Sequence, residues 1–140
     1  MIINVHAGHN PNGKVASGAA GYLIESVEDR IVKDKVIELL RKNGHTVYDC
    51  TEDNGTSQAD VLNKIIAKCN SHNVDIDVSI HFNAGAADRD TETTGTEVYV
   101  YGLNAGATEY ADRVLKNISN LGFRNRGIKV NQSLAVLRRT

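Results

Sequence analysis

Two kinds of pattern alternate along the chain: short apolar runs, and longer stretches in which apolar residues recur with a helical period. The short runs are residues 2–5, 46–50 and 76–80, and each has the length of a buried strand. The stretches between them, from about residue 24 to 43 and from 57 to 69, place apolar side chains every three or four positions. The predicted order is therefore strand, helix, strand, helix, strand.

Both predicted helices have recognisable ends. Gly44 follows the first helix in the position where glycine commonly ends a helix, and Ser57 with Asp60 resembles a capping box that opens the second. The repeat that marks the expected inner face of the first helix consists of Val32, Val36, Leu39, Leu40 and Asn43. That of the second consists of Val61, Leu62, Ile65, Ile66 and Cys69.

The second half of the chain repeats the alternation less strongly. A β-rich run at 97–101 precedes a helical stretch from about 107 to 121, and residues 127–130 and 134–137 are predicted as short strands. Strands separated by helices at this spacing indicate βαβ units with right-handed crossovers. We therefore predict an α/β fold, a three-layer α/β/α sandwich around a mostly parallel twisted sheet, forming one domain over residues 1–140.

Composition narrows the class of protein. The chain is 41% hydrophobic and 24% charged with a formal net charge of −1, which is typical of a globular domain and argues against a nucleic-acid binder. Its two cysteines, Cys50 and Cys69, lie in apolar segments and are expected to be buried free thiols. No leader peptide and no membrane-spanning run is visible, so we expect synthesis in the cytoplasm without a membrane partner.

Two histidines and a glutamate are candidate metal ligands. His9 follows the first predicted strand, His81 follows the third, and Glu25 begins the helix after the first strand. Because the carboxyl ends of parallel strands meet at one edge of a sheet, these side chains are expected to converge there. Two histidines with one carboxylate form a ligand set of catalytic zinc sites, which leave a fourth position for water.

Each of these residues also has an ordinary structural interpretation. The histidines fit hydrogen-bonded loop residues, and Glu25 fits a first-turn glutamate stabilised by the helix dipole. His6 is expected to face away from the candidate site in a structural or supporting role. Asn10 and Asn83 flank the two histidines, where loop capping is the default interpretation and substrate contact the alternative.

A competing motif overlaps the first histidine. Residues 8–15, GHNPNGKV, come one residue short of the phosphate-binding pattern G-x-x-x-x-G-K-[ST] and follow a strand. However, Val15 replaces the hydroxyl that would bind Mg²⁺, and no helix is predicted to start there. Nucleotide binding through Gly8 to Lys14 is thus a weaker alternative.

Several of these segments together resemble one known family. They are GHN at 8–10, Glu25 heading a helix that ends in GHTV at 44–47, SIHFNAG at 79–85, and the tail from NRGIK at 125–129 to residue 137. In order and spacing, they resemble the zinc-dependent N-acetylmuramoyl-L-alanine amidases of the amidase-3 type, found in phage endolysins and bacterial autolysins.

The resemblance implies a Zn²⁺ ion held by His9, Glu25 and His81, with Glu25 favoured over Glu28 because it lies 19 residues before Gly44. It implies hydrolysis of the amide between N-acetylmuramic acid and L-alanine in bacterial peptidoglycan. The expected setting is the cell wall, reached after lysis or holin-mediated release. The alternative in another class is a wall-binding or regulatory domain that keeps the metal but is inactive.

The sequence departs from the family pattern at its end. In the family, a second glutamate that acts as general acid/base follows the segment resembling 134–140, and no residue up to Thr140 matches it. We therefore expect no catalytic residue besides the metal ligands, a domain without its final strand and helix, and weak activity or none. The surface that such a truncation exposes is expected to favour self-association.

Overall fold

A computed structural model describes residues 1–83 and 94–140. The chain divides into two compact units, residues 1–89 together with residue 140, and residues 90–139. Each unit is described by itself.

A three-stranded parallel sheet forms the centre of the first unit. Its strands are β1 (Ile2–Ala7), β2 (Thr46–Asp49) and β3 (Ile76–Ile80), in the order β2-β1-β3. The apolar run of β1 is buried from its second residue onward, because a strand with a neighbour on each side is covered along its whole length. The predicted strands and their parallel pairing are confirmed.

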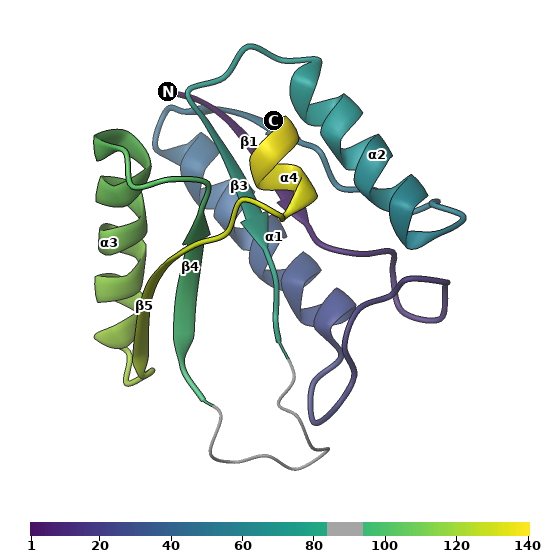
Figure 1. The fold of residues 1–140 in the computed structure, drawn as a ribbon, viewed down its shortest axis with the longest axis horizontal. Coiled ribbons are helices and arrows are strands. Elements are labelled where there is room, and N and C mark those ends of the chain that lie inside the picture. Colours follow the sequence, from purple (N-terminus) through teal and green to yellow (C-terminus); the bar gives the residue numbers. More distant parts are fainter. Residues whose placement is uncertain (84–93) are drawn as a thin grey trace. The chain divides into compact units, whose positions relative to one another are not determined.

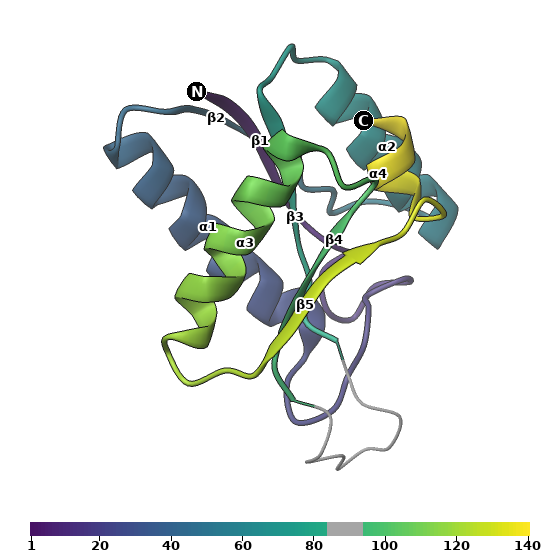
Figure 2. The same cartoon turned by 60° about the vertical axis from the view of Figure 1, so that its left-hand side comes forward.

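Helices α1 (Glu25–Lys42) and α2 (Gln58–Asn70) pack on opposite faces of this sheet. Ile3 and Val5 point to one face and form the core cluster with Ile37 of α1. Asn4, which points the other way, donates a hydrogen bond from its side chain to the carbonyl of Cys69 in α2. Figure 2 shows α1 and α2 on either side of the three strands.

The buried face of α1 differs from the predicted one. Val36 and Leu40 pack against the core as expected, but Val32 is 37% exposed and Leu39 46% exposed. The residues buried instead are mostly polar, namely Glu25, Ser26, Asp29, Lys33 and Ile37. Residue spacings of three to four put them on one side of the helix. The predicted face was wrong in part because partners elsewhere in the chain, such as Asp49 for Lys33, stabilise charged groups in buried positions.

Helix α2 forms as predicted. The Ser57 hydroxyl accepts a hydrogen bond from the Asp60 amide at 3.1 Å, while the Asp60 carboxylate accepts one from the Thr56 amide at 2.8 Å. Its buried residues are Val61, Ile65, Ile66 and Cys69. Cys50 and Cys69 are both buried free thiols, as expected from their apolar surroundings in sequence.

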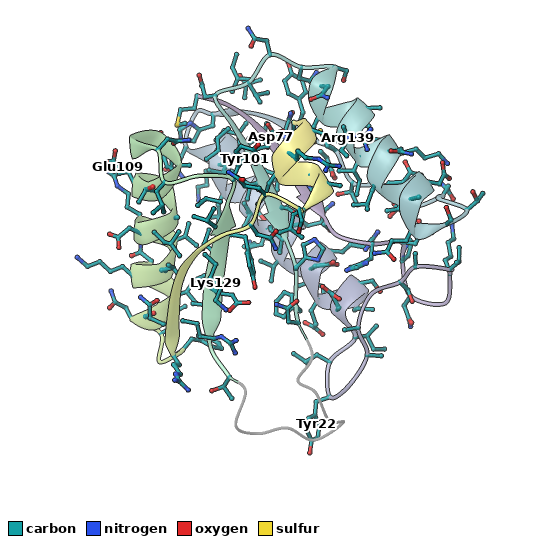
Figure 3. All side chains as sticks on the ribbon, viewed as in Figure 1. Tyr22, Asp77, Tyr101, Glu109, Lys129 and Arg139 are labelled. Atoms are coloured by element: carbon teal, nitrogen blue, oxygen red, sulfur yellow. The ribbon has the colours of Figure 1, made fainter. Side chains whose placement is uncertain are left out.

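The second unit contains β4 (Thr96–Val100), α3 (Ala105–Ser119), β5 (Asn125–Val130) and α4 (Ala135–Arg139). Strands β4 and β5 are parallel, and α3 makes the crossover between them (Figure 1). Figure 3 labels Lys129 on β5, whose ammonium group pairs with the Glu97 carboxylate of β4. A parallel βαβ unit is what the alternating pattern of this half predicts.

The strand predicted at residues 134–137 is wrong, since the short helix α4 begins at Ala135 within this segment. An apolar run of four residues carries too little periodicity to separate a strand from a helix. Here the Asn131 side chain accepts hydrogen bonds from the amide and hydroxyl of Ser133, forming a turn just ahead of the helix.

The α/β class with parallel strands is confirmed in both units. All pairings between the named strands in the described residues are parallel. Among the described residues, no helix combines the length and the apolar character needed to cross a bilayer.

Candidate metal centre

The structure brings His9, Glu25 and His81 together at the carboxyl edge of the first sheet. One ligand atom from each of the three side chains lies within 4.8 Å of the others. His9 comes from the loop after β1, Glu25 is the first residue of α1, and His81 follows β3 directly. Parallel pairing of β1 with β3 puts both strand ends at this edge, which is the convergence that the sequence pattern predicts.

Glu25 lies between the two imidazole rings. One of its carboxylate oxygens is 3.3 Å from His9 Nε2, and the other is 3.0 Å from His81 Nδ1. The two rings are nearly perpendicular, with centroids 4.9 Å apart. The carboxylate also accepts backbone N–H bonds from Ala19 at 2.7 Å and Phe82 at 3.2 Å, so its orientation is fixed from four sides.

Electrostatics keep Glu25 ionised. Burial of this side chain raises its pKa, but hydrogen bonds from His81, His9 and the Ala19 amide outweigh that effect and hold the pKa far below the ordinary glutamate range. The same contact with Glu25 raises the pKa of His9. A permanently ionised carboxylate between two imidazoles is a ready donor set for a divalent cation.

Exposure is uneven around the three groups. The side chain of Glu25 is 5% exposed, whereas His9 is 24% and His81 42% exposed. The carboxylate therefore forms the floor of the site and the imidazoles form its solvent-facing side. Tyr22, at the outer end of the loop before α1, is 76% exposed (Figure 3).

Two glycines, Gly8 and Gly18, allow this close approach, a role that the sequence pattern assigned to neither of them. A Cβ atom on Gly8 would lie 2.1 Å from the His81 ring, and one on Gly18 would lie 2.6 Å from a Glu25 oxygen and 2.7 Å from His9 Cδ2. Gly18 also has a φ of +80°, a conformation that favours glycine. Loop glycines are common, so their position in sequence alone carried no signal of this role.

Asn10 and Asn83, which flank the two histidines in sequence, differ in their surroundings. Asn10 is buried, and its amide nitrogen donates to the carbonyls of Val15 and Gly55 while its oxygen accepts the Gly55 amide. This is the loop-capping arrangement. Asn83 is exposed, and substrate contact by it stays a prediction.

His6 is 1% exposed and lies on β1, which fits the structural role expected of it. Burial lowers its pKa to about 4, so the ring is neutral at physiological pH. It is not among the three grouped ligands.

The phosphate-loop alternative finds no support. The Lys14 ammonium group donates to the Asp53 carbonyl at 2.7 Å and to the Asn54 side chain at 2.8 Å. No helix of the described residues begins directly after Lys14, since α1 starts only at Glu25. A phosphate at Gly8 to Lys14 would lack the helix N-terminus that such loops use.

Comparison with known proteins gives the family. A family model described as N-acetylmuramoyl-L-alanine amidase matches residues 2–140, nearly the whole chain. The chain belongs to this amidase family. The resemblance noted from GHN, Glu25 and SIHFNAG is thereby confirmed, and so is the enzyme class to which the domain belongs.

A curated protein is similar to this chain over the chain's full length. An uncharacterised protein of Clostridium perfringens strain 13 is 37% identical over 144 residues, a match that covers 100% of this chain and 40% of that protein. The chain therefore spans 40% of the length of this curated relative.

Solved structures of an endolysin catalytic domain and of an amidase share the fold. The catalytic domain of the CD27L endolysin, described as targeting Clostridia difficile, matches with a TM-score of 0.87 at 24% identity, covering 100% of this chain and 76% of that one. The N-acetylmuramoyl-L-alanine amidase of Clostridium difficile 630 matches with a TM-score of 0.75 at 24% identity, covering 99% and 73%.

The chemistry of the site fits a metal ion. Two imidazoles and one ionised carboxylate converge within coordination reach, and two glycines leave the space that side chains would fill. Histidine nitrogen and carboxylate oxygen are ligands that zinc accepts.

Proposed function

We propose that this domain hydrolyses the amide bond between N-acetylmuramic acid and L-alanine in bacterial peptidoglycan, using Zn²⁺ held by His9, Glu25 and His81. The observation that carries the proposal is the convergence of these three side chains within 4.8 Å in a chain of the amidase family. The name of one matched structure, an N-acetylmuramoyl-L-alanine amidase of Clostridium difficile 630, supports the bond that is cut.

Zinc suits this ligand set better than magnesium or calcium, because the latter prefer shells of oxygen ligands. When bound, zinc supplies Lewis-acid polarisation of the amide carbonyl and lowers the pKa of a water molecule to about 7. Two histidines and one carboxylate leave room for water and substrate in the remaining position.

The side chains of the domain hold this site in a defined geometry. Ionised Glu25 contributes the negative charge, and the Ala19 and Phe82 amides keep its two oxygens directed at the two histidines. His81 is 42% exposed, which supports access of a peptidoglycan substrate to the site. Action at the cell wall follows from this substrate.

The alternative is a wall-binding or regulatory domain of the same fold that retains the metal without turnover. It is kept because three side chains grouped for metal binding are compatible with metal retention alone as well as with turnover. Metal binding is common to both functions, so only product formation separates them.

Incubation with purified cell walls is the test, with new N-terminal L-alanine quantified by labelling and mass spectrometry over several hours. The proposal predicts release that stops with chelator, returns with Zn²⁺ and is lost in His81→Ala. His72→Ala is the matched control, because His72 lies in the same unit and stacks on Tyr48 away from the three ligands. Zinc binding without any release of L-alanine would favour the non-catalytic alternative.

A further inference from the structure

We propose that Arg30 is a positioning residue for the metal site, holding the backbone of the loop that carries His9. The inference rests on the proposed metal site and adds to it a residue outside the ligand set. Arg30 lies on α1, five residues after Glu25, and its side chain is 18% exposed.

The Arg30 guanidinium group binds the ligand loop directly. One terminal nitrogen donates to the carbonyl of His9 at 2.9 Å, and the other donates to the carbonyl of Gly8 at 3.3 Å. Two consecutive peptide carbonyls are thereby fixed at the point where β1 gives way to the loop. Gly8 is also the residue whose missing side chain makes room for the His81 ring.

The same group ties that loop to two other segments. It donates to the Ser26 carbonyl of α1 at 3.0 Å, to the Glu52 carbonyl at 3.2 Å, and to the Asp53 carboxylate at 2.7 and 3.1 Å. Glu52 and Asp53 follow β2. Arg30 thus joins the loops after two neighbouring strands to the helix that begins with the third ligand.

His9 needs such support because of its backbone conformation. Its φ is +60°, in the left-handed region that non-glycine residues rarely adopt. A residue in this region persists when surrounding contacts determine it, and the bond from Arg30 to the His9 carbonyl is such a contact. Without it, the loop is expected to relax and to move the imidazole away from Glu25.

The shape of the guanidinium group, as well as its charge, is needed to hold the loop. It presents five donors in a fixed fork, whereas a lysine presents one ammonium group that cannot reach Gly8, His9 and Asp53 together. Asp53 is 56% exposed and accepts from the outer edge of the fork, so it orients the guanidinium group without belonging to the core.

The test compares metal affinity with stability of the metal-free protein. Zn²⁺ dissociation constants are measured by competition with a chromophoric chelator for wild type, Arg30→Ala, Arg30→Lys and Asp53→Asn. Arg41→Ala is the control, since Arg41 also binds a backbone carbonyl, that of Val47 at 2.7 Å, from the far end of the same helix. Thermal unfolding with chelator shows that each variant is folded at the titration temperature.

We expect Arg30→Ala to weaken Zn²⁺ binding about 10- to 100-fold, the range found when residues that orient metal ligands are removed. Arg30→Lys is expected to recover only part of that loss, Asp53→Asn to lose less than Arg30→Ala, and Arg41→Ala to bind like wild type. Co²⁺-loaded Arg30→Ala is expected to show an altered visible spectrum, because a displaced imidazole changes the coordination of the ion. Added guanidinium ion at millimolar concentration is expected to restore part of the affinity.

Unchanged Zn²⁺ affinity and an unchanged Co²⁺ spectrum in Arg30→Ala would overturn the inference while leaving the proposed metal site intact. Equal losses in Arg30→Ala and Arg41→Ala would also overturn it, because a general loss of stability would then explain both. Failure of the wild-type protein to bind Zn²⁺ would instead overturn the metal site itself. The two failures are therefore distinguishable.

Discussion

Gly18 shows how a single residue without a side chain determines the site. A methyl group there would meet both a Glu25 oxygen and the His9 ring. Gly13 has a similar φ, +83° against +80°, but a Cβ at Gly13 would have nothing within 4 Å. Alanine substitutions at Gly18 and Gly13 therefore separate the effect of backbone strain on stability from the effect of displaced ligands on metal binding.

We predict that Gly18→Ala and Gly13→Ala each lose about 1–2 kcal/mol of unfolding free energy in metal-free protein through backbone strain. Only Gly18→Ala is expected also to lose Zn²⁺ affinity, by about tenfold or more. Chemical denaturation and chelator competition measure the two quantities. Equal zinc affinity in the two variants would contradict the role given to Gly18.

His6 predicts a pH dependence of stability. Its pKa is lowered from 6.5 to about 4 in the folded protein by burial. Between these two pH values the unfolded chain binds more protons than the folded one. The contribution of His6 to the free energy of unfolding is therefore complete above pH 6.5 and declines as the pH falls toward 4, by about 3 kcal/mol in total.

Asp29 has the opposite effect. Burial raises its pKa from 3.8 to about 6, so its contribution to stability is lost as the pH rises through that range.

Urea denaturation at several pH values between 4 and 7, with chelator present, tests the direction of both pH effects on stability. The two contributions are opposite in sign and of similar size, so they largely cancel in wild type. Relative to wild type, His6→Asn is therefore expected to lose less stability on acidification, and Asp29→Asn is expected to lose more. Parallel pH profiles for the two variants and wild type would show that neither residue titrates as stated.

Among the helices, α1 and α2 differ in how far their sequence determined their packing. The buried face of α2 is apolar, so its period correctly predicted Val61, Ile65, Ile66 and Cys69, whereas the fifth predicted residue, Leu62, is only partly buried. The buried face of α1 carries Asp29 and Lys33, and Lys33 is stabilised by Asp49, sixteen residues away on β2. A periodicity argument assigns charged residues to solvent, and only the folded chain shows which of them have partners.

The N-terminus of α2 provides a prediction for that helix. Ser57→Ala is expected to cost about 1 kcal/mol of unfolding free energy, because the Asp60 amide loses its acceptor. Ser57→Asp restores an acceptor and is expected to keep most of the stability. Denaturant midpoints of the three proteins measure this, and an Ala variant as stable as wild type would argue against the cap.

For the molecule as a whole, the strand order explains why the three ligands could be predicted although no local motif links them. Two parallel strands bring His9 and His81 to one edge, and the helix returning from that edge brings Glu25. The residues that refine the site, Gly18 and Arg30, act through loop conformation and through contacts across three segments. Neither residue is visible in the periodicity of the sequence, so the sequence indicated the three candidate ligands without the residues that position them.

Metal binding should stabilise the whole protein by mass action. At a free Zn²⁺ concentration 100 times the dissociation constant, the expected gain is about 2.7 kcal/mol, seen as a higher unfolding temperature. His81→Ala is expected to lose this zinc-dependent shift, while the control His72→Ala keeps it. A shift of equal size in both variants would place the bound zinc elsewhere.

The most direct test is a crystal structure of the zinc-loaded protein with diffraction data collected on both sides of the zinc absorption edge. The account predicts one anomalous peak within bonding distance of His9 Nε2, a Glu25 carboxylate oxygen and a ring nitrogen of His81. Absence of a peak there, or side-chain ends of these three residues that point away from one another, would contradict it.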